Sequence, residues 1–348
     1  MNTYEKYIIN ISATIFDALV ALDKLTADIL TLFVVDNNYK LKGTVTDGDI
    51  RRALLKGITL DDSITTVMNK NFHYFTAANI NVNLVKKCRY NKIWLLPYLS
   101  DDGVLQKVFN LQNQISILPV DAVLMAGGKG ERLRPLTETT PKPLLPIGDK
   151  CIIDYNVDRL INYGISNIFV TINYLKEQIE NHFSTPRNDV EIKCIREPYY
   201  LGTIGSVKFI NHFRNDSILI MNSDLFTNIN FEEFYLHFID NNADMSVATI
   251  PYSVSIPYGI FKFENQSIKI TGIEEKPKYN YYANSGIYLI KRSILNLIPD
   301  DIFFDATDLI GVLISKGYSV IRFPIVGYWI DIGKYEDYNK AQDFVKYI

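Results

Sequence analysis

Residues 121–146 read DAVLMAGGKGERLRPLTETTPKPLLP. The first residues of this stretch are mostly apolar and run directly into a glycine-rich turn, as a buried strand does in an α/β sheet. Glycines allow backbone N–H groups to approach phosphate oxygens, and Lys129, Arg132 and Lys142 supply the positive charge that phosphates need. The stretch therefore predicts a phosphate-binding turn at the start of an α/β domain.

Two better-known phosphate-binding motifs do not fit this turn. A Walker A loop would need Gly-Lys-Ser/Thr after four spacer residues, and the dinucleotide fingerprint would need glycine where Leu133 stands. A lone glycine-rich turn would otherwise be read as a plain connection from a strand to a helix. The arginine, the Pro-Lys-Pro of residues 141–143 and the flanking strand together favour phosphate binding.

Strands and helices alternate after this turn. We expect strands at 121–128, 167–173 and 217–224, and helices around 153–164 and 175–183. Such alternation is typical of parallel strands with right-handed crossovers, in which sites lie beyond the carboxyl ends of the strands. The later stretches 244–252, 259–273 and 284–290 are rich in strand-forming residues and predict an added mixed sheet, followed by a final helix from Ile332 to Tyr347.

The N-terminal part contains an internal repeat. Stretches that begin at Leu32 and Trp94, about 64 residues apart in register, each show a strand, a turn rich in Asp, Asn or Gly, and a second strand. A helical pattern with one apolar face precedes the first copy: Ile15, Ala18, Leu19 and Leu22. We expect residues 79–90 to play the same part before the second copy, and residues 115–119 to form the linker to the next domain.

A helix start is also visible in the first copy. Thr46 stands at the cap, Asp49 at the third position, and Gly57 is the expected end. The repeat and the run GTVTDGDIRR of residues 43–52 resemble a pair of CBS domains, a Bateman module, over residues 1–117.

The resemblance to CBS domains implies a ligand site. In that family a Thr or Ser and an Asp three residues later hold a nucleotide ribose, so Thr46 and Asp49 are the candidates for a regulatory, adenosine-type site. Residues 107–112 of the second copy lack this pair. The alternative is that Thr46 and Asp49 only form a capping box, which by itself stabilises a helix by about 1 kcal/mol.

Composition limits the classes of function. The 348 residues are 47% hydrophobic and 22% charged with a net charge of −3, which indicates two or three folded domains and no basic surface for nucleic acid or membranes. The three cysteines and four histidines show neither a disulfide framework nor zinc-ligand spacing. The N-terminus shows no signal peptide and the chain no membrane span, so we expect a cytoplasmic protein.

The glycine-rich turn belongs to a longer signature. Residues 121–348 resemble the sugar-1-phosphate nucleotidylyltransferases, whose motif Gly-Gly-x-Gly-x-Arg-Leu-x-Pro-Leu-Thr is followed by Pro-Lys-Pro, as it is here. Further landmarks of that family stand in order: 197–205, 222–224, 258–259, 274–277, 284–286 and 329–331. Ser223 departs from the glycine that many members have. The resemblance implies a Rossmann-like, GT-A-like nucleotidyltransferase domain with a mixed sheet over residues 118–348.

The implied reaction explains why these residue types are needed. An oxygen of a sugar 1-phosphate attacks the α-phosphorus of a nucleoside triphosphate in line and expels pyrophosphate. The attacking oxygen is already anionic, so no general base is required. The protein must position two polyanions and stabilise the developing charge, which is the work of cations and a metal ion. Asp224 and Asp331, each at a strand end, are the expected ligands of Mg²⁺.

The resemblance also assigns roles to single residues. Arg132 would engage the β- and γ-phosphates, Lys142 the α-phosphate and Lys276 the sugar phosphate. The expected catalytic residues are thus Arg132, Lys142, Asp224 and Lys276. The expected nucleotide-binding residues are Ala126, Gly127, Gly128, Gly130, Gly202 and Thr203, and the expected sugar-phosphate-binding residues are Gly259, Glu275, Lys276 and Asn284. The alternatives are that Asp224 caps a helix and that Glu275 and Lys276 form a solvated charged turn.

Other functions compete with this one. A glycosyltransferase would need Asp-x-Asp where Asn222, Ser223 and Asp224 stand. A catalytically silent, nucleotide-sensing subunit would be free to lose the charged residues that this chain retains. The Ala-Gly-Gly turn and the fused CBS pair resemble guanylyltransferases, which implies GTP with mannose 1-phosphate or glucosamine 1-phosphate and a GDP-sugar for surface or flagellar glycans. UTP, CTP or dTTP is the alternative. The CBS pair would bind a regulator or form a homo-oligomer.

Overall fold

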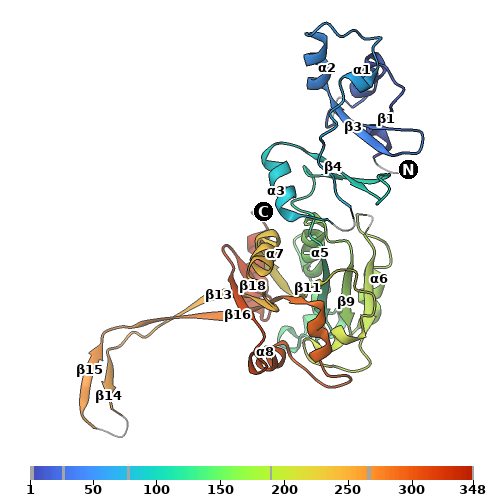
Figure 1. Cartoon of the computed structure of the whole chain (residues 1–348). Coiled ribbons are helices and arrows are strands. Elements are labelled where there is room, and N and C mark those ends of the chain that lie inside the picture. Colours follow the sequence, from blue (N-terminus) through green and yellow to red (C-terminus); the bar gives the residue numbers. More distant parts are fainter. Residues whose placement is uncertain (1–3, 26–27, 77–78, 189, 265–267, 347–348) are drawn as a thin grey trace. The chain divides into compact units, whose positions relative to one another are not determined.

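The computed structural model describes residues 4–25, 28–76, 79–188, 190–264 and 268–346 (Figure 1). The chain forms two compact units. The N-terminal unit comprises the residues up to Leu118 together with Asn162–Gly164, and the C-terminal unit comprises Pro119–Ile161 and the residues from Ile165 onward. Two sequence predictions extend beyond the described residues, at 265–267 and at Tyr347.

The first half of the N-terminal unit is a small α/β fold. Its elements are η1 (Glu5–Tyr7), β1 (Ile8–Asn10), α1 (Ile15–Asp23), β2 (Thr31–Val35), β3 (Leu41–Thr46), α2 (Asp47–Leu54) and η2 (Ile64–Thr66). The strands form one sheet in the order β1-β2-β3, with β1 parallel and β3 antiparallel to β2. Ile15, Ala18 and Leu22 are buried, which confirms the predicted apolar face of α1.

The second half repeats the order of helix, strand and strand. It consists of α3 (Val82–Tyr90), β4 (Leu95–Leu99) and β5 (Leu105–Asn110). β4 begins 64 residues after β2, and β5 begins 64 residues after β3. This spacing agrees with the repeat that the sequence indicates. Residues 111–118, which follow β5, contain no counterpart of α2.

Most of the segment predicted as a linker packs within the N-terminal unit. The Ile115 N–H donates to the Asn162 carbonyl at 2.7 Å, and the Leu118 N–H donates to the Tyr163 carbonyl at 3.0 Å. Ile117 is 2% exposed. Ser116 and Leu118 are also buried, whereas Ile115 is exposed. The boundary between the two units falls inside the predicted linker, between Leu118 and Pro119.

A mixed sheet of seven strands organises the C-terminal unit, in the order β10-β9-β6-β11-β16-β13-β17. The strands are β6 (Val120–Ala126), β9 (Ile168–Ile172), β10 (Ile192–Arg196), β11 (Ser217–Asn222), β13 (Met245–Ser255), β16 (Lys278–Lys291) and β17 (Val320–Pro324). β10, β9, β6 and β11 are parallel, whereas β16 is antiparallel to both of its neighbours. The predicted α/β class with a mixed sheet is confirmed.

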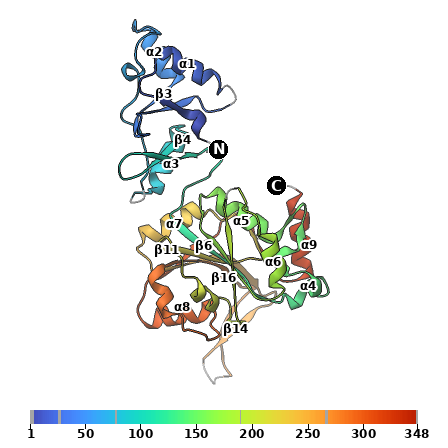
Figure 2. The same cartoon turned by 90° about the vertical axis from the view of Figure 1, so that its right-hand side faces the viewer.

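Helices cover both faces of this sheet (Figure 2). They are α4 (Leu136–Thr139), α5 (Ile152–Asn162), α6 (Lys176–His182), α7 (Phe231–Asp240), α8 (Ala306–Ser315) and α9 (Tyr335–Val345), with the short turns η3 (Glu131–Leu133), η4 (Lys142–Leu144), η5 (Gly205–Phe209) and η6 (Arg292–Leu297). α5, α6 and α9 were predicted from the sequence; α7 and α8 were not. Among the helices that the structure describes, none has the length and apolar character needed to cross a membrane.

The strand order places a crevice at one sheet edge. The chain proceeds from β6 to β9 and β10 on one side and then returns to place β11 on the other side of β6. Ligands in open α/β sheets bind at such a reversal, outside the carboxyl ends of the strands. Here those ends are Ala126 and Asn222. The glycine turn and Asp224 therefore follow the two strands that flank the crevice.

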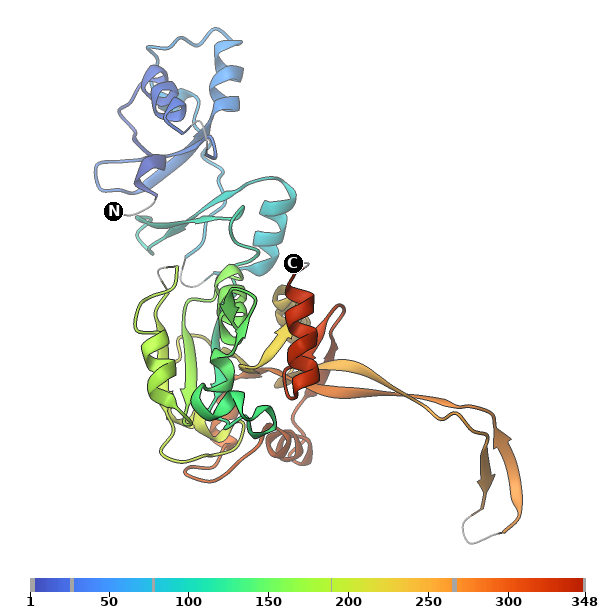
Figure 3. The same ribbon diagram turned by 180° about the vertical axis from the view of Figure 1, so that it is seen from behind.

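A two-stranded β-ribbon extends from the sheet (Figures 1 and 3). It is formed by the distal parts of β13 and β16, from the pair Thr249 and Asn284 to the pair Ser255 and Lys278, and by β14 (Ile260–Phe263) and β15 (Ile270–Glu274). A register shift between Val247 and Thr249 lies at its base. Many of its large side chains are exposed, including Tyr252, Phe261, Phe263, Ile273 and Tyr281.

Candidate functional site

A pocket of about 630 Å³ lies at the ends of β6 and β11. Its lining includes every residue predicted to bind the nucleotide and three of the four predicted catalytic residues: Ala126, Gly127, Gly128, Gly130, Gly202, Thr203, Arg132, Lys142 and Asp224. Residues far apart in the sequence thus meet at the sheet edge that the strand order selects.

The glycine turn leaves no room for side chains at two positions. A Cβ atom at Gly127 would lie 2.7 Å from Glu197 Oε1. Gly130 has a φ of 63°, and its carbonyl accepts a hydrogen bond from Thr137 Oγ1 at 2.9 Å. A side chain in this left-handed conformation would be strained. The turn is therefore held open, with its backbone free to approach a ligand.

Lys142 is a buried cation, because only 8% of the residue is exposed. Its Nζ is paired with Asp224 Oδ2 and lies 3.9 Å from Asp331 Oδ1. The preceding residue, Pro141, and the short η4 turn point this lysine inward. One ammonium group thus stands beside two carboxylates, of which Asp224 lines the pocket and Asp331 does not.

Pairing of two short strands brings these aspartates together. β12 (Leu225–Thr227) and β18 (Trp329–Asp331) are antiparallel, with Leu225 opposite Asp331. The Ile332 N–H donates to the Asp224 carbonyl at 3.2 Å. Asp224 is followed by a strand, so the alternative that it caps a helix is wrong; Asn230 caps the next helix, α7.

The turn around Asp224 is fixed from two sides. The Ser223 hydroxyl donates to the Met125 carbonyl at 2.7 Å, so the serine found in place of the family's glycine is satisfied in its buried position. The Asn156 side chain on α5 donates to the carbonyls of Ser223 and Leu225 at 3.2 and 2.9 Å. The sequence analysis did not identify Asn156, whose position on a buried helix face among apolar residues was the available signal.

The donor set fits a hard divalent cation. Asp224 Oδ1 is buried and has no hydrogen-bond partner among the residues that the structure describes. Burial and the neighbouring Asp224 raise the pKa of Asp331, and the charges of Lys142 and Arg132 offset this only in part. Two carboxylates that repel each other and retain a buried, unpartnered oxygen are suited to binding Mg²⁺, which prefers oxygen ligands.

The second nucleotide loop is anchored to the start of α8. The Asp305 Oδ1 accepts hydrogen bonds from the Thr203 N–H at 2.8 Å and from its hydroxyl at 3.1 Å, and the Ala306 N–H donates to the same hydroxyl at 2.9 Å. A Cβ atom at Gly202 would lie 2.6 Å from the Phe304 carbonyl. The Thr203 hydroxyl is therefore engaged within the protein, while the loop backbone lines the pocket.

The residues expected to bind the sugar phosphate lie elsewhere. Gly259, Glu275 and Lys276 are on the β-ribbon and do not line the pocket. Gly259 and Glu275 are neighbours, because a Cβ atom at Gly259 would lie 2.9 Å from Glu275 Oε2. The Asn284 side chain donates to the Tyr288 hydroxyl and accepts from the Gly286 N–H. The structure does not bring these four residues together with the pocket, and their sugar-binding role stays a prediction.

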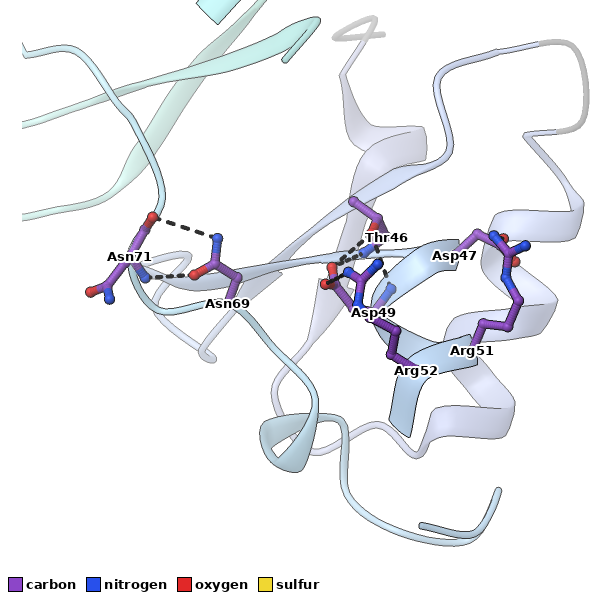
Figure 4. Close-up of polar contacts among 7 residues, drawn as sticks. All are labelled: Thr46, Asp47, Asp49, Arg51, Arg52, Asn69 and Asn71. Atoms are coloured by element: carbon purple, nitrogen blue, oxygen red, sulfur yellow. Dashed lines mark hydrogen bonds and ion pairs between the residues drawn. The ribbon is translucent and has the colours of Figure 1, made fainter. Parts of the chain in front are cut away.

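Thr46 and Asp49 form the predicted capping box in the N-terminal unit (Figure 4). The Thr46 N–H and hydroxyl donate to Asp49 Oδ2 at 2.9 and 2.7 Å, and Arg52 donates to Asp49 Oδ1 at 2.6 Å. The pair is therefore fully engaged within the protein. A ribose would have to share or replace these contacts.

A further polar cluster lies on α5, on α6 and on the residue that precedes α5. The side chains of Cys151, Asp154 and His182 have ligand atoms within 4.8 Å of one another. The spacing of cysteines and histidines in the sequence did not predict this cluster. Asp154 Oδ1 is already paired with His182 Nε2 and with Arg187, each at 2.7 Å. The charge of this buried carboxylate is thus compensated within the protein.

Comparison with known proteins identifies the C-terminal unit. Residues 121–347 match the family described as nucleotidyl transferase. The chain belongs to the nucleotidyl transferase family. The glycine turn, Lys142 and Asp224 of this nucleotidyl transferase are all within the matched residues.

The chain is similar to curated proteins that differ in nucleotide. It is 28% identical over 240 residues to the UTP–glucose-1-phosphate uridylyltransferase of a Synechocystis species. This match covers 63% of this chain and 62% of that one. It is 25% identical to the mannose-1-phosphate guanylyltransferase catalytic subunit beta of Xenopus tropicalis, over 62% of each chain. Such names do not decide the base that this nucleotidyl transferase uses.

A solved structure shows the same fold. HddC from Yersinia pseudotuberculosis is 25% identical, with a TM-score of 0.51 over 65% of this chain and 99% of that chain. The chain spans only 51% to 62% of the lengths of the curated relatives it matches. The N-terminal unit lies outside the matched family region.

Proposed function

We propose that the chain transfers GMP from GTP to a hexose 1-phosphate and releases pyrophosphate. The observation that carries this proposal is the pocket at the ends of β6 and β11, which is lined by a glycine turn, a buried lysine and Asp224, with an Asp331 oxygen 3.9 Å from the same lysine. Each of these features serves a reaction between two phosphate groups. The family to which residues 121–347 belong supports it.

The geometry suggests how the residues act. Backbone N–H groups of residues 127–130 approach the triphosphate, and Arg132 neutralises its β- and γ-phosphates as pyrophosphate leaves. Lys142 holds the α-phosphate, where negative charge develops during the in-line attack by the sugar phosphate oxygen. No group needs to remove a proton, because the attacking oxygen is ionised.

Asp224 and Asp331 would hold Mg²⁺. When bound, the ion would supply positive charge to the phosphate groups during transfer. The pairing of β12 with β18 and the hydrogen bonds from Asn156 to the carbonyls of Ser223 and Leu225 fix the backbone beside these two residues.

The choice of GTP and of the sugar rests on resemblance. The Ala-Gly-Gly form of the turn and the fusion to an N-terminal repeat resemble guanylyltransferases, and relatives of the chain carry that name. Mannose 1-phosphate or glucosamine 1-phosphate would be the acceptor. The reaction would take place in the cytoplasm, where nucleoside triphosphates are available. The GDP-sugar product would supply surface or flagellar glycan synthesis.

We also propose that residues 1–117 form a CBS pair. The repeated order of helix, strand and strand and the pair Thr46 and Asp49 support it. The pair would bind a regulatory nucleotide or assemble the chain into a homo-oligomer.

A pyrophosphate-release assay tests the activity. GTP, ATP, UTP, CTP and dTTP are each combined with mannose 1-phosphate, glucosamine 1-phosphate and glucose 1-phosphate in the presence of Mg²⁺. We expect turnover with GTP and one of the sugar phosphates. Turnover only with another nucleotide would contradict the choice of base. No turnover with any pair would favour a silent, nucleotide-sensing subunit.

A further inference from the structure

Glu197 is a buried carboxyl group in the wall of the pocket that the reaction described above does not use. It follows the last residue of β10, and its N–H donates to the Ile172 carbonyl of β9 at 2.9 Å. Only 3% of the residue is exposed, yet it lines the pocket. Its Oε1 lies 2.7 Å from the position of a Cβ atom on Gly127, so the carboxyl group faces the backbone of the glycine turn.

One of the two carboxyl oxygens lacks a hydrogen-bond partner among the described residues. This oxygen, Oε2, is buried without a hydrogen bond, and so are the neighbouring hydroxyls of Thr171 and Ser206. Burial raises the pKa of Glu197, and the nearby Ser206, Leu201 N–H and Thr171 lower it to a smaller extent. A buried carboxyl group with an unsatisfied oxygen is costly. Its position at a pocket wall therefore indicates that a ligand supplies the missing donors.

The glycine turn separates this group from the cations. A Cβ atom on Gly127 would touch Glu197, whereas one on Gly130 would lie 3.1 Å from Lys142 Cβ. One end of the turn thus faces a carboxyl group, and the other end faces the lysine and the two aspartates. A carboxylate repels phosphate, so the triphosphate belongs at the Lys142 end. The group that meets Glu197 must be a neutral donor of hydrogen bonds, as the base of the nucleotide is.

We propose that the carboxylate of Glu197 selects guanine by accepting hydrogen bonds from its N1–H and its 2-amino group. An ionised carboxylate only accepts hydrogen bonds, and its two oxygens suit two adjacent donors. Guanine alone among the common bases offers two adjacent N–H donors on its pairing edge. Adenine and cytosine place a ring nitrogen acceptor beside their amino group, and uracil and thymine place carbonyls on both sides of their single N–H. This inference rests on the proposed function, whose nucleotide pocket it uses.

The first test needs no variant. The full chain with Mg²⁺ is titrated by calorimetry with GTP, ITP, UTP and ATP; ITP differs from GTP only in lacking the 2-amino group. A hydrogen bond to a charged group accounts for about a tenfold or larger change in affinity. We expect GTP to bind at least about tenfold more tightly than ITP and about 100-fold more tightly than UTP or ATP. Equal affinities for GTP and ITP would overturn the inference.

The second test replaces the carboxylate by an amide. Glu197→Gln should lower the affinity for GTP by about 10- to 100-fold. It should raise the affinity for UTP, because an amide accepts a hydrogen bond from N3–H of uracil and donates one to its carbonyl. Glu233→Gln, an exposed glutamate on α7, is the matched control and should leave all affinities unchanged. Unchanged discrimination in Glu197→Gln would overturn the inference. If Glu197→Gln does not fold, the comparison of GTP with ITP still decides.

The two proposals fail in different ways. If the wild-type chain binds no nucleoside triphosphate, the proposed function fails and the role of Glu197 fails with it. If the chain binds GTP and releases pyrophosphate but does not distinguish ITP from GTP, only the role of Glu197 fails.

Discussion

Two carboxylates that repel each other share one cation, Lys142, beside the pocket. Asp224 and Asp331 are close enough that their mutual repulsion contributes to the raised pKa of Asp331. Lys142 is the cation nearest to both. Substrate phosphates would compete with the carboxylates for this lysine, and Asp224 and Asp331 would be the residues that hold a metal ion. The charged groups of the site therefore serve to bind phosphates and a cation, and none of them is needed to transfer a proton.

Replacement of either aspartate tests this arrangement. Asp224→Asn and Asp331→Asn should each lower kcat by about 100-fold or more, because a stabilising charge at the phosphates is lost. Pyrophosphate release at saturating GTP and sugar phosphate measures the effect. Asp343→Asn, at an exposed position on α9, should keep the wild-type rate. Wild-type rates in both variants, with activity still abolished by EDTA, would remove these residues from the metal site.

Asp154 predicts a pH dependence of stability. Burial raises the pKa of this carboxyl group, but the bond from His182 and the charges of His182 and Arg187 outweigh burial and lower it. A carboxylate with a lowered pKa stabilises the fold above its unfolded pKa, near 3.8, and this contribution is lost as the pH falls through the folded value. Acid should therefore weaken the native C-terminal unit through this group.

Asp154→Asn makes that dependence measurable. At pH 7 the variant should be destabilised by about 3 kcal/mol, since removal of one partner leaves Arg187 without its buried counter-charge. The difference in the free energy of unfolding between the variant and wild type should shrink below about pH 4. Urea unfolding at pH 7 and at pH 3 measures it, with the exposed Asp300→Asn as control. A difference that stays constant over this range would show that the charge of Asp154 does not contribute.

At the scale of elements, local sequence patterns predicted the helices, strands and caps that depend on neighbouring residues in the chain. The strand before the glycine turn, the helices α5 and α6 and the capping box at Thr46 all follow from periodicity and caps. α7 and α8 also begin with capping residues, Asn230 and Asp305, which the sequence analysis did not use.

Tertiary contacts determine what the sequence could not predict. The nearness of Asp224 to Asp331 depends on the pairing of β12 with β18, which no local pattern specifies. The sequence analysis paired these two residues only through the family resemblance. Asn156 and Glu197 were missed because their importance arises from neighbours that are distant along the chain.

The β-ribbon leads to a kinetic prediction. Lys276 stands between β15 and β16 with a φ of 45°, outside the pocket lining. If it binds the sugar phosphate, Lys276→Ala should raise KM for the sugar phosphate by about tenfold, with a smaller effect on KM for GTP. Arg132→Ala should instead raise KM for GTP more than KM for the sugar phosphate. Steady-state kinetics with Lys278→Ala, the exposed lysine two residues later, supplies the control. The reverse pattern would require the two phosphate assignments to be exchanged.

At the scale of the whole molecule, two units share one chain, and only the C-terminal unit is matched by the nucleotidyl transferase family. The N-terminal unit contains two similar capping boxes, Thr14 with Asp17 on α1 and Thr46 with Asp49 on α2. Only the second pair matches the ribose-binding positions of CBS domains. Variants of the two boxes can therefore be compared: both should lose helix stability, but only variants of Thr46 and Asp49 should lose ligand binding.

We predict that a nucleotide binds at Thr46 and Asp49 and changes catalysis in the C-terminal unit. Coupling between sites is typically about 1 to 3 kcal/mol, so the ligand should shift the apparent affinity for substrate by about five- to 150-fold. Calorimetry of the full chain with AMP measures binding at this second site. Kinetics of the same chain with and without AMP measure the coupling. The double variant Thr46→Ala/Asp49→Ala should lose both effects. Thr14→Ala/Asp17→Ala removes an equivalent capping box and should lose neither, because each box stabilises its helix to a similar extent. If both double variants respond to AMP as the parent chain does, or if AMP neither binds nor alters the kinetics, Thr46 and Asp49 only cap α2.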